Sequence, residues 1–401
     1  MPPELTIAQT PLSQGHSSDS PSRPRPLGRA RLITAFFFVF ALFVPLIGTA
    51  LRWDPVASQE NRILARIPTV PQNFKQVQRF ADLFLAFYRD HFGFRNTLIR
   101  GLTLARFHGG LALDQNTNII IGKYGWLFFP SHVPDMEADR NLDPFTPAEL
   151  DAWQRMLEQR NKFCEDHGFP FIAVIPPDKQ SVYMEFVPEE FSRLGPKSRL
   201  DQLIDRLHET HSPVHLVDLR AALIEAKKYH RLYFKTDTHW NDYGGFASYP
   251  VILAAVNSIL PGVKLVPQPA SDFIPRSTTH SGDLARYMNL YYEYNEDWPQ
   301  LVRRTPFPPI VTPENPYIPM TTYGTDPKAP ALYMIHDSYT LYLYQFLGPN
   351  FSRTCWQWTT ILNGPLVVAF KPNVVIDEFL ERTMYLPVPE DTADVRAEQP
   401  R

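Results

Sequence analysis

The chain has 401 residues, of which 39 are Lys or Arg and 42 are Asp or Glu, so its formal net charge is −3. This balance leaves no general basic excess for binding nucleic acid. Its 40 prolines exclude an all-helical bundle, because a proline inside a helix costs ~3 kcal/mol. Its 2 cysteines exclude a disulfide scaffold and a cysteine-based zinc site, and leave Cys164 and Cys355 as a pair that an oxidising compartment would allow.

The N-terminal part has the pattern of a membrane protein. Residues 1–31 are rich in proline and serine, which predicts a disordered cytoplasmic tail. Leu32–Leu51 carries no charge and is long enough, ~30 Å as a helix, to cross a bilayer. Four arginines lie between residues 23 and 31 and only Arg52 follows closely, so the positive-inside rule predicts that the rest of the chain is outside the cytoplasm. A cleaved signal peptide is the alternative, and it places the body on the same side.

Residues 52–110 are predicted to form a helical lead-in. Phe80, Leu83, Phe84, Phe87 and Tyr88 recur at spacings of three and four, which predicts a helix with one apolar stripe packed in a core. The following segment, residues 119–129, has the pattern of a strand, a tight turn and a second strand.

From residue 146 onward, helical and strand patterns alternate. Thr146 and Glu149 predict a capping box, and Gly168 predicts the end of that helix. A second helix is expected around residues 197–210. Apolar runs predict strands buried on both faces at residues 171–175, 214–217, 332–335 and 374–376. This alternation favours an α/β fold with a mainly parallel sheet between helices.

The segment Pro299–Pro330 contains nine prolines. Because proline is rejected by helices and by central strands, we expect a long extended loop on the surface. It lies between the two polar clusters described next and is a candidate wall of a binding groove.

The first polar cluster is Asp237-Thr238-His239. A carboxylate beside a histidine holds one imidazole tautomer and stabilises the imidazolium, which supports a general base. The alternative is a turn aspartate next to a histidine with a structural role. A metal site formed with Asp337 is a weaker interpretation, because no second histidine stands at a ligand spacing.

The second cluster, His336-Asp337-Ser338-Tyr339, directly follows a predicted buried strand. Ligands of open α/β sheets bind beyond the carboxyl ends of the strands, so Ser338 is placed where a nucleophile is expected. A helix after it would direct backbone N–H groups at an oxyanion. The alternative is an ordinary helix cap at Asp337 or Ser338.

A series of short motifs, in order along the chain, resembles the SGNH-hydrolase-like O-acetyltransferases of exopolysaccharide export, the alginate AlgJ/AlgX-like family. The resemblance covers roughly residues 60–385. The matching motifs are Asn61-Arg62, Asp90–Arg95, Ile121–Phe128, Ile175–Lys179, Val182-Tyr183, Lys235–Asn241, Gly282–Leu284, Asp337–Tyr339, Lys371–Ile376 and Glu381-Arg382.

The resemblance implies an SGNH-hydrolase-like α/β domain over residues 111–385, preceded by the anchor and followed by a C-terminal tail, residues 386–401. It implies Ser338 as nucleophile, His239 as base and Asp237 as the group that orients His239. We expect the substrate to be bound by residues within these motifs, namely Trp240, Asn241, Tyr339 and Lys179. Before Asp337 the family usually has glycine, and we expect His336 in this chain to crowd the pocket.

The implied activity is transfer of an acetyl group to hydroxyls of an extracytoplasmic polysaccharide, without a metal or another cofactor. The implied acetyl donor is a membrane-bound acyltransferase, and the implied location is the inner membrane with the catalytic domain in the periplasm. Two alternatives stay open: an esterase that removes acetyl groups from the same glycans, and a non-catalytic polysaccharide-binding or assembly protein.

Overall fold

The computed structural model describes residues 29–51, 54, 64–108, 119–131, 137–288, 290–291, 293–305, 307 and 318–396. Among these, residues 29–54 and 64–97 form one compact unit, and the residues from 98 onward form a second. Most of the predicted tail 1–31 and the motif Asn61-Arg62 lie outside the described residues.

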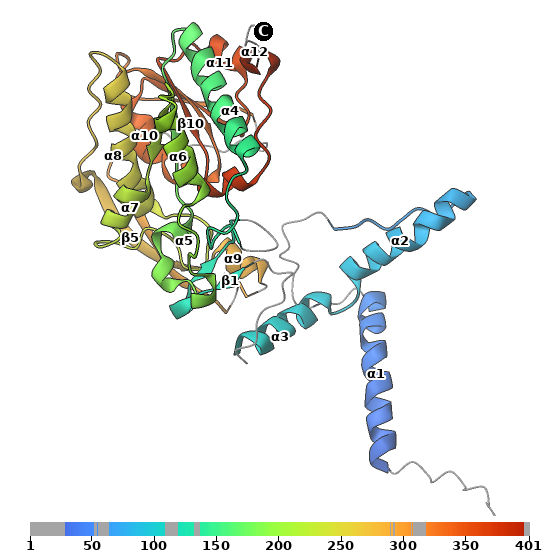
Figure 1. Cartoon of the computed structure of the whole chain (residues 1–401). Helices are drawn as coiled ribbons and strands as arrows, with labels where there is room; N and C mark the ends of the chain where they lie inside the picture. Colours follow the sequence, from blue (N-terminus) through green and yellow to red (C-terminus); the bar gives the residue numbers. More distant parts are fainter. Residues whose placement is uncertain are drawn as a thin grey trace, which may run out of the picture. The chain divides into compact units, whose positions relative to one another are not determined.

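The first unit contains helix α1, Arg29–Leu51, and helix α2, Phe74–His91 (Figure 1). Helix α3, Arg95–His108, begins in the first unit and continues into the second. Within α1, residues 31–49 have a mean hydropathy of 2.4 and are long and apolar enough to cross a membrane. In the helical lead-in predicted for residues 52–110, the described residues 64–73 are not helical and α2 begins at Phe74, because Pro68 and Pro71 precede it and Asn73 caps it by accepting the Gln76 N–H.

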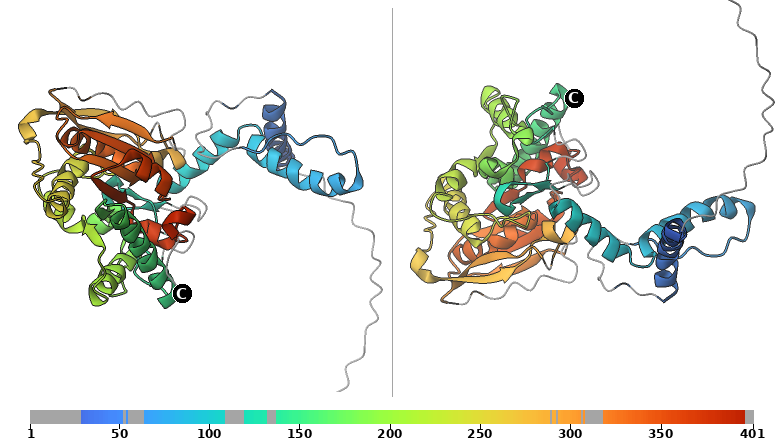
Figure 2. Two further views of the ribbon diagram at one scale, coloured as in Figure 1. Left: turned by 90° about the horizontal axis from the view of Figure 1, so that it is seen from above. Right: turned by 90° about the horizontal axis from the view of Figure 1, so that it is seen from below.

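The second unit is built on a six-stranded sheet with the order β4-β3-β10-β8-β9-β7. Its strands are β3 (Phe171–Ile175), β4 (His215–Asp218), β7 (Met320–Tyr323), β8 (Ala331–His336), β9 (Arg353–Trp358) and β10 (Val374–Glu378). All neighbouring pairs are parallel except β7 with β9, which confirms the predicted mainly parallel sheet. Strands from the middle and the end of the chain therefore lie side by side, as the colours in Figure 2 show.

Helices cover both faces of this sheet, as predicted. The α-helices described from residue 147 onward are α4 (Pro147–Asp166), α5 (Lys179–Val182), α6 (Arg199–Glu209), α7 (Arg220–Ala226), α8 (Asp242–Ile259), α9 (Asp283–Tyr287), α10 (Tyr344–Leu347), α11 (Gly364–Phe370) and α12 (Ala393–Arg396). Alternate strand residues divide the core: Ile172 and Val174 pack with α7, α8 and α10, whereas Ala173 and Ile175 pack with α4, α6 and α11. Glu149 and Thr146 form the predicted capping box.

One strand prediction was wrong in its burial. The run at residues 214–217 does form a strand, β4, but His215, Leu216 and Asp218 are half-buried. The reason is its place at the edge of the sheet, where β3 is its only neighbour in the strand order.

The prediction of one continuous loop at Pro299–Pro330 was also wrong. Pro299 lies inside strand β6 (Glu296–Arg303), which pairs antiparallel with β5 (Phe273–His280) in a two-stranded ribbon, and β7 follows at the sheet edge. These strands tolerate proline because each has an edge without a partner strand in the described sheets. Residues 308–317, at the centre of the segment, lie outside the described residues.

The predicted strand, turn and strand at residues 119–129 are confirmed as β1 (Ile120–Ile121) paired antiparallel with β2 (Leu127–Phe128). Leu127 packs with Leu284 and Met288, from and just after α9, in a third small cluster. This packing joins the hairpin to the segment that supports the candidate site.

Packing of the second unit continues beyond residue 385. The buried guanidinium of Arg160 in α4 pairs with Asp391 at 2.7 Å and also with Asp377 of β10. Val395 is buried in the same core. The two cysteines, Cys164 and Cys355, are both buried and are free thiols, so the disulfide that the composition allowed is not formed.

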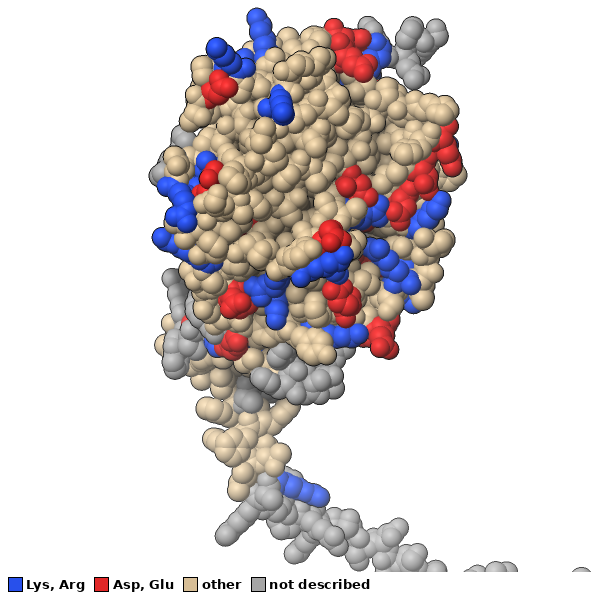
Figure 3. Space-filling model, turned by 90° about the vertical axis from the view of Figure 1, so that its left-hand side faces the viewer, with Lys and Arg blue, Asp and Glu red and all other residues tan. Residues whose placement is uncertain are grey.

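Figure 3 shows the face of the molecule that is on the left in Figure 1, over α8 and the ribbon β5–β6. Charged side chains of both signs are interspersed on it, and its upper middle carries few of them. This face has no field of one sign, in keeping with the near-neutral charge of the chain.

Candidate active site

Asp237, His239 and Ser338 come together at the carboxyl end of β8. The Ser338 hydroxyl lies 2.8 Å from Nε2 of His239, and Nδ1 of His239 lies 2.7 Å from Oδ1 of Asp237. The serine is separated from the histidine by 99 positions in the sequence. The observed arrangement is that of a serine, a base and a carboxylate in hydrogen-bonded series, which can activate a hydroxyl for attack on an ester.

Ser338 is presented by the end of the sheet. Strand β8 ends at His336, and Ser338 begins a short 3-10 helix, Ser338–Tyr342. Asp337 caps this helix by accepting the Tyr339 N–H at 2.9 Å, so the cap interpretation is confirmed alongside the position at the strand end. The Ser338 N–H is the first of the helix and has no acceptor within it, which leaves it available to an oxyanion.

The loop that carries Asp237 and His239 is closed by local contacts. Tyr233 and Trp240 form an antiparallel bridge across it. Asp237 accepts the backbone N–H of His239 at 3.0 Å through Oδ1 and that of Asp283 at 2.9 Å through Oδ2. A Cβ at Gly282 would lie 2.4 Å from the Thr236–Asp237 backbone, so this close approach requires glycine.

The two carboxyl groups beside His239, those of Asp237 and Asp283, have pKa values that are shifted in opposite directions. Burial alone would raise the pKa of Asp237, but the hydrogen bond and charge of His239 hold it below its usual value. Asp283 lies 3.9 Å from His239 Nδ1, and its pKa is raised by burial and by the charge of Asp237. Asp237 is therefore the carboxylate that stays ionised and bound to the histidine. The His239 side chain is 19% exposed and can be reached by a substrate.

Lys179 lies beneath this loop rather than in an open groove. Its side chain is buried, and Nζ donates to the carbonyl oxygens of Phe234 at 3.0 Å, Lys235 at 3.2 Å and Asp237 at 2.6 Å. Burial lowers the pKa of Lys179 to about 8, against the opposing charges of Glu296 and Asp237. All three donors of the ammonium group are used, so these contacts favour a positioning role over the expected sugar contact.

The other three residues expected to bind the substrate are also buried in structural contacts. Trp240 donates its indole N–H to the Tyr339 carbonyl at 2.9 Å, and Tyr339 donates its hydroxyl to the Thr238 carbonyl at 2.7 Å. Asn241 caps α8 by accepting the N–H groups of Tyr243 and Gly244. Trp240 and Tyr339 thus connect the histidine loop to the serine turn.

His336 does not occupy the pocket as we expected. Its ring is 1% exposed, packs near Trp356 and Trp358, and lies 3.1 Å through Nε2 from the Tyr344 hydroxyl. Burial lowers its pKa to about 4. The larger side chain is accommodated in the aromatic core behind the serine turn.

A metal is a poor fit to the residues present. Asp237, His239 and Asp283 each offer a ligand atom within 4.8 Å of the others. However, His239 Nδ1 is hydrogen-bonded to Asp237, and Asp283 Oδ1 accepts the backbone N–H of Thr238 at 2.7 Å. A cation there would have to replace the hydrogen bonds that hold the loop.

Two contributors were assigned no role from the sequence. Asp283 supports the loop through Asp237 and Thr238. Arg382 is buried, and its guanidinium lies over the Tyr339 ring at 5.8 Å from the centroid. Both lie in motifs that carry the family resemblance, Gly282–Leu284 and Glu381-Arg382. Their place in these motifs is the signal by which the sequence could have identified them.

Residues 119–349 match the family model described as "SGNH hydrolase-like domain, acetyltransferase AlgX". The chain belongs to this family. The match contains all three residues of the hydrogen-bonded series, and it confirms the predicted SGNH-like α/β fold and the AlgJ/AlgX-like resemblance.

Two relatives are named as probable alginate O-acetylase AlgJ. The Pseudomonas aeruginosa protein is 26% identical over 238 residues, 57% of this chain and 56% of the relative. The Pseudomonas putida protein is 26% identical over 305 residues, 69% of this chain and 72% of the relative. The match thus spans only about half the length of the first of them.

Two solved structures are similar to this chain at low sequence identity. The structure of Bacillus cereus PatB1 with a sulfonyl adduct has a TM-score of 0.50 at 12% identity and covers 66% of this chain and 97% of that one. The O-acetyltransferase domain of Pseudomonas putida AlgJ has a TM-score of 0.45 at 20% identity and covers 68% of this chain and 94% of that one.

Proposed function

We propose that the protein is an O-acetyltransferase that moves an acetyl group through Ser338 to hydroxyls of an extracytoplasmic polysaccharide. The observation that carries the proposal is the series from Asp237 through His239 to Ser338, with contacts of 2.7 and 2.8 Å. Membership of the acetyltransferase family and the relatives named alginate O-acetylases support the choice of acetyl as the group and of a glycan as its acceptor.

In the first half-reaction, His239 holds its Nδ1 proton on Asp237 and accepts the Ser338 proton at Nε2. The serine oxygen attacks the acetyl carbonyl of the donor and forms a tetrahedral oxyanion, which the Ser338 N–H stabilises. Collapse of this intermediate breaks the bond to the donor oxygen, which takes the proton from His239. The products are an acetyl ester on Ser338 and the free donor alcohol or carrier.

In the second half-reaction, His239 removes a proton from a sugar hydroxyl, and that oxygen attacks the acetyl-serine. The tetrahedral intermediate collapses, the ester bond to Ser338 breaks, and the serine oxygen recovers its proton from His239. Water would complete the same reaction as hydrolysis, so bound acceptor must keep water from His239. An esterase therefore differs from the proposed enzyme only in what occupies the acceptor position.

We further propose that α1 anchors the protein in the inner membrane, with the second unit in the periplasm. Support comes from the apolar segment at residues 31–49 and from the arginines that precede it. The donor is then a membrane-bound acyltransferase that passes acetyl groups outward, and the enzyme hands them to the polymer.

The test compares Ser338→Ala with Ser277→Ala, whose serine lies on the exposed end of β5. Both proteins are purified as full chains in detergent and given an activated acetyl ester, with and without a set of oligosaccharides that includes alginate fragments. We expect Ser338→Ala to lose acetyl release by at least ~10³-fold and Ser277→Ala to keep it. Wild-type acetyl release that never appears on a glycan would identify an esterase, and unchanged turnover of Ser338→Ala would reject the nucleophile.

A further inference from the structure

Within the first unit, helix α2 exposes an apolar stripe that has no part in the proposed chemistry. The stripe consists of Phe74, Val77, Ala81, Phe84 and Leu85, at the spacings that place residues on one side of a helix. The exposed fractions are 76% for Phe74, 52% for Val77, 47% for Phe84 and 45% for Leu85. Of the residues whose spacing predicted a core-packed stripe, Leu83 and Phe84 are exposed, whereas Phe80, Phe87 and Tyr88 are half-buried, so the predicted packing is only partial.

The end of α2 is joined to the end of α1 within the first unit. The Gly93 N–H, two residues past α2, donates to the Thr49 hydroxyl at 2.7 Å. A Cβ at Gly93 would lie 2.3 Å from the Gly48–Thr49 backbone, so the two segments touch through a glycine that admits no side chain. Asp54 adds a second junction by accepting the Asn96 N–H at 2.7 Å and the Thr97 hydroxyl at 2.6 Å.

This junction fixes the position of the carboxyl end of α2 relative to α1. Thr49 is the last residue of the apolar segment at residues 31–49. If α1 crosses a bilayer, Thr49 lies where the hydrocarbon gives way to the head groups. The carboxyl end of α2 is then held at that level, and a helix that starts there with an exposed apolar stripe has the composition of an interfacial helix.

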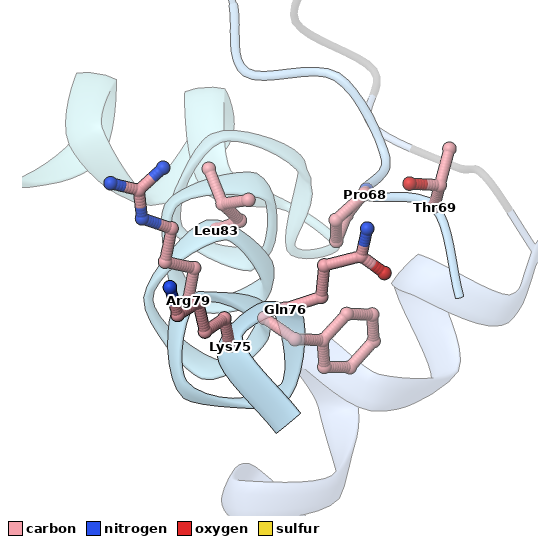
Figure 4. A pocket seen from close by; sticks show the side chains of 7 residues that line it. Pro68, Thr69, Lys75, Gln76, Arg79 and Leu83 are labelled. Carbon is pink, nitrogen blue, oxygen red and sulfur yellow. The ribbon is translucent and has the colours of Figure 1, made fainter. Parts of the chain in front are cut away.

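The side of α2 away from the stripe carries the cations that such a helix uses. Lys75 and Arg79 are one turn apart and border a hollow of about 520 Å³ that is also lined by Phe80, Leu83, Pro68, Thr69 and Gln76 (Figure 4). An interfacial helix carries Lys and Arg on its polar face, where they are attracted by anionic lipids. The apolar stripe and the cations on the opposite side therefore favour one partner, a lipid surface.

We propose that α2 lies in the outer surface of the membrane, with its apolar stripe among the upper acyl chains and Lys75 and Arg79 on the side that faces the head groups and water. This proposal rests on α1 crossing the bilayer, which is part of the proposed function. The first unit would then contact the membrane through α2 as well as through α1. Two contacts limit how far the enzyme can tilt or move away from the membrane surface on which its donor lies.

The test uses the full chain in lipid nanodiscs of zwitterionic and anionic phospholipid. An environment-sensitive fluorophore is attached at Phe84→Cys on the stripe, at the matched position Asp82→Cys on the polar side of α2, and at Phe36→Cys in α1. Native Cys164 and Cys355 are buried, and peptide mass spectrometry checks that they stay unlabelled. Quenching by lipids with a nitroxide near the top of the acyl chain reports depth.

We expect the labels at 36 and 84 to be blue-shifted and quenched at least ~3-fold more than the label at 82. Quenching at 36 without quenching at 84 would overturn the proposal and leave the stripe for a protein partner. Absence of quenching at both would overturn it together with the anchor. Neither result would depend on Ser338, so acetyl transfer in detergent is judged separately.

Discussion

Replacing Lys179 by methionine tests whether a buried cation holds the catalytic loop. Two effects oppose each other in the free energy of folding. Burial lowers the Lys179 pKa from 10.5 to about 8, so keeping the ammonium charged at pH 7 costs about 3 kcal/mol, which Lys179→Met would recover. The same change leaves three buried carbonyl oxygens without donors, at about 1–3 kcal/mol each. We therefore expect a net loss of stability of about 3 kcal/mol.

The effect on catalysis should exceed the effect on stability. The carbonyls that Lys179 holds belong to the loop of Asp237 and His239, and a displacement of ~1 Å at reacting groups costs ~10²-fold in rate. We expect kcat of Lys179→Met to fall ~10²-fold with little change in KM for the acyl ester. In the wild type, deprotonation removes one of the three donors, so the rate should fall above pH about 8, whereas the variant should lack this descending limb.

The assay combines urea unfolding with initial rates between pH 6 and 10. Lys197→Met is the matched control, because that lysine is exposed and pairs only with surface acids. A folded Lys179→Met protein with kcat within ~3-fold of the wild type would refute the assigned positioning role.

Three further changes test other parts of the site and its frame. Asp283→Ala removes the acceptor of the Thr238 N–H, and we expect kcat to fall ~10-fold while KM is kept. His336→Gln removes a histidine whose pKa is about 4 in the folded protein and 6.5 in the unfolded chain. Because the unfolded chain takes up the proton first as the pH falls, the wild type should lose about 3 kcal/mol of stability between pH 6.5 and 4. The variant should not show this loss. Asp391→Ala leaves the buried Arg160 short of a partner and should cost about 3–5 kcal/mol in urea unfolding.

The controls for these changes are exposed residues of the same type. His208→Gln and Glu390→Ala should both leave urea unfolding at neutral pH unchanged. Equal acid sensitivity of His336→Gln and the wild type would contradict the burial argument. A loss below ~1 kcal/mol in Asp391→Ala would show that residues beyond 385 do not help to hold the second unit together.

The sequence was most informative where the pattern is local. The apolar runs at residues 171–175 and 332–335 predict buried strands because both faces of each strand are covered. Asp237 and His239 are two residues apart, and Ser338 directly follows a strand end, so their types and places indicate chemistry before their distance is known. The motif order of the family brought the two clusters into one hypothesis.

Long-range packing could not be predicted in the same way. Lys179 reaches carbonyls that are 55 to 58 positions away, and no local pattern tells a buried donor from a surface lysine. Pro299 lies in a strand because the ribbon β5–β6 leaves one side of each strand unpaired. The spacing of apolar residues in α2 predicts a helix, but it does not predict what covers the apolar side of that helix.

The central claim is that acetyl passes through an ester on Ser338. The most direct measurement is peptide mass spectrometry after acid quenching of the wild type with excess acetyl donor, with and without acceptor glycan. We predict acetyl on the peptide that contains Ser338, less of it when acceptor is present, and none in Ser338→Ala. Acetyl transfer to the glycan in Ser338→Ala, or acetyl found only at another side chain of the wild type, would contradict the account.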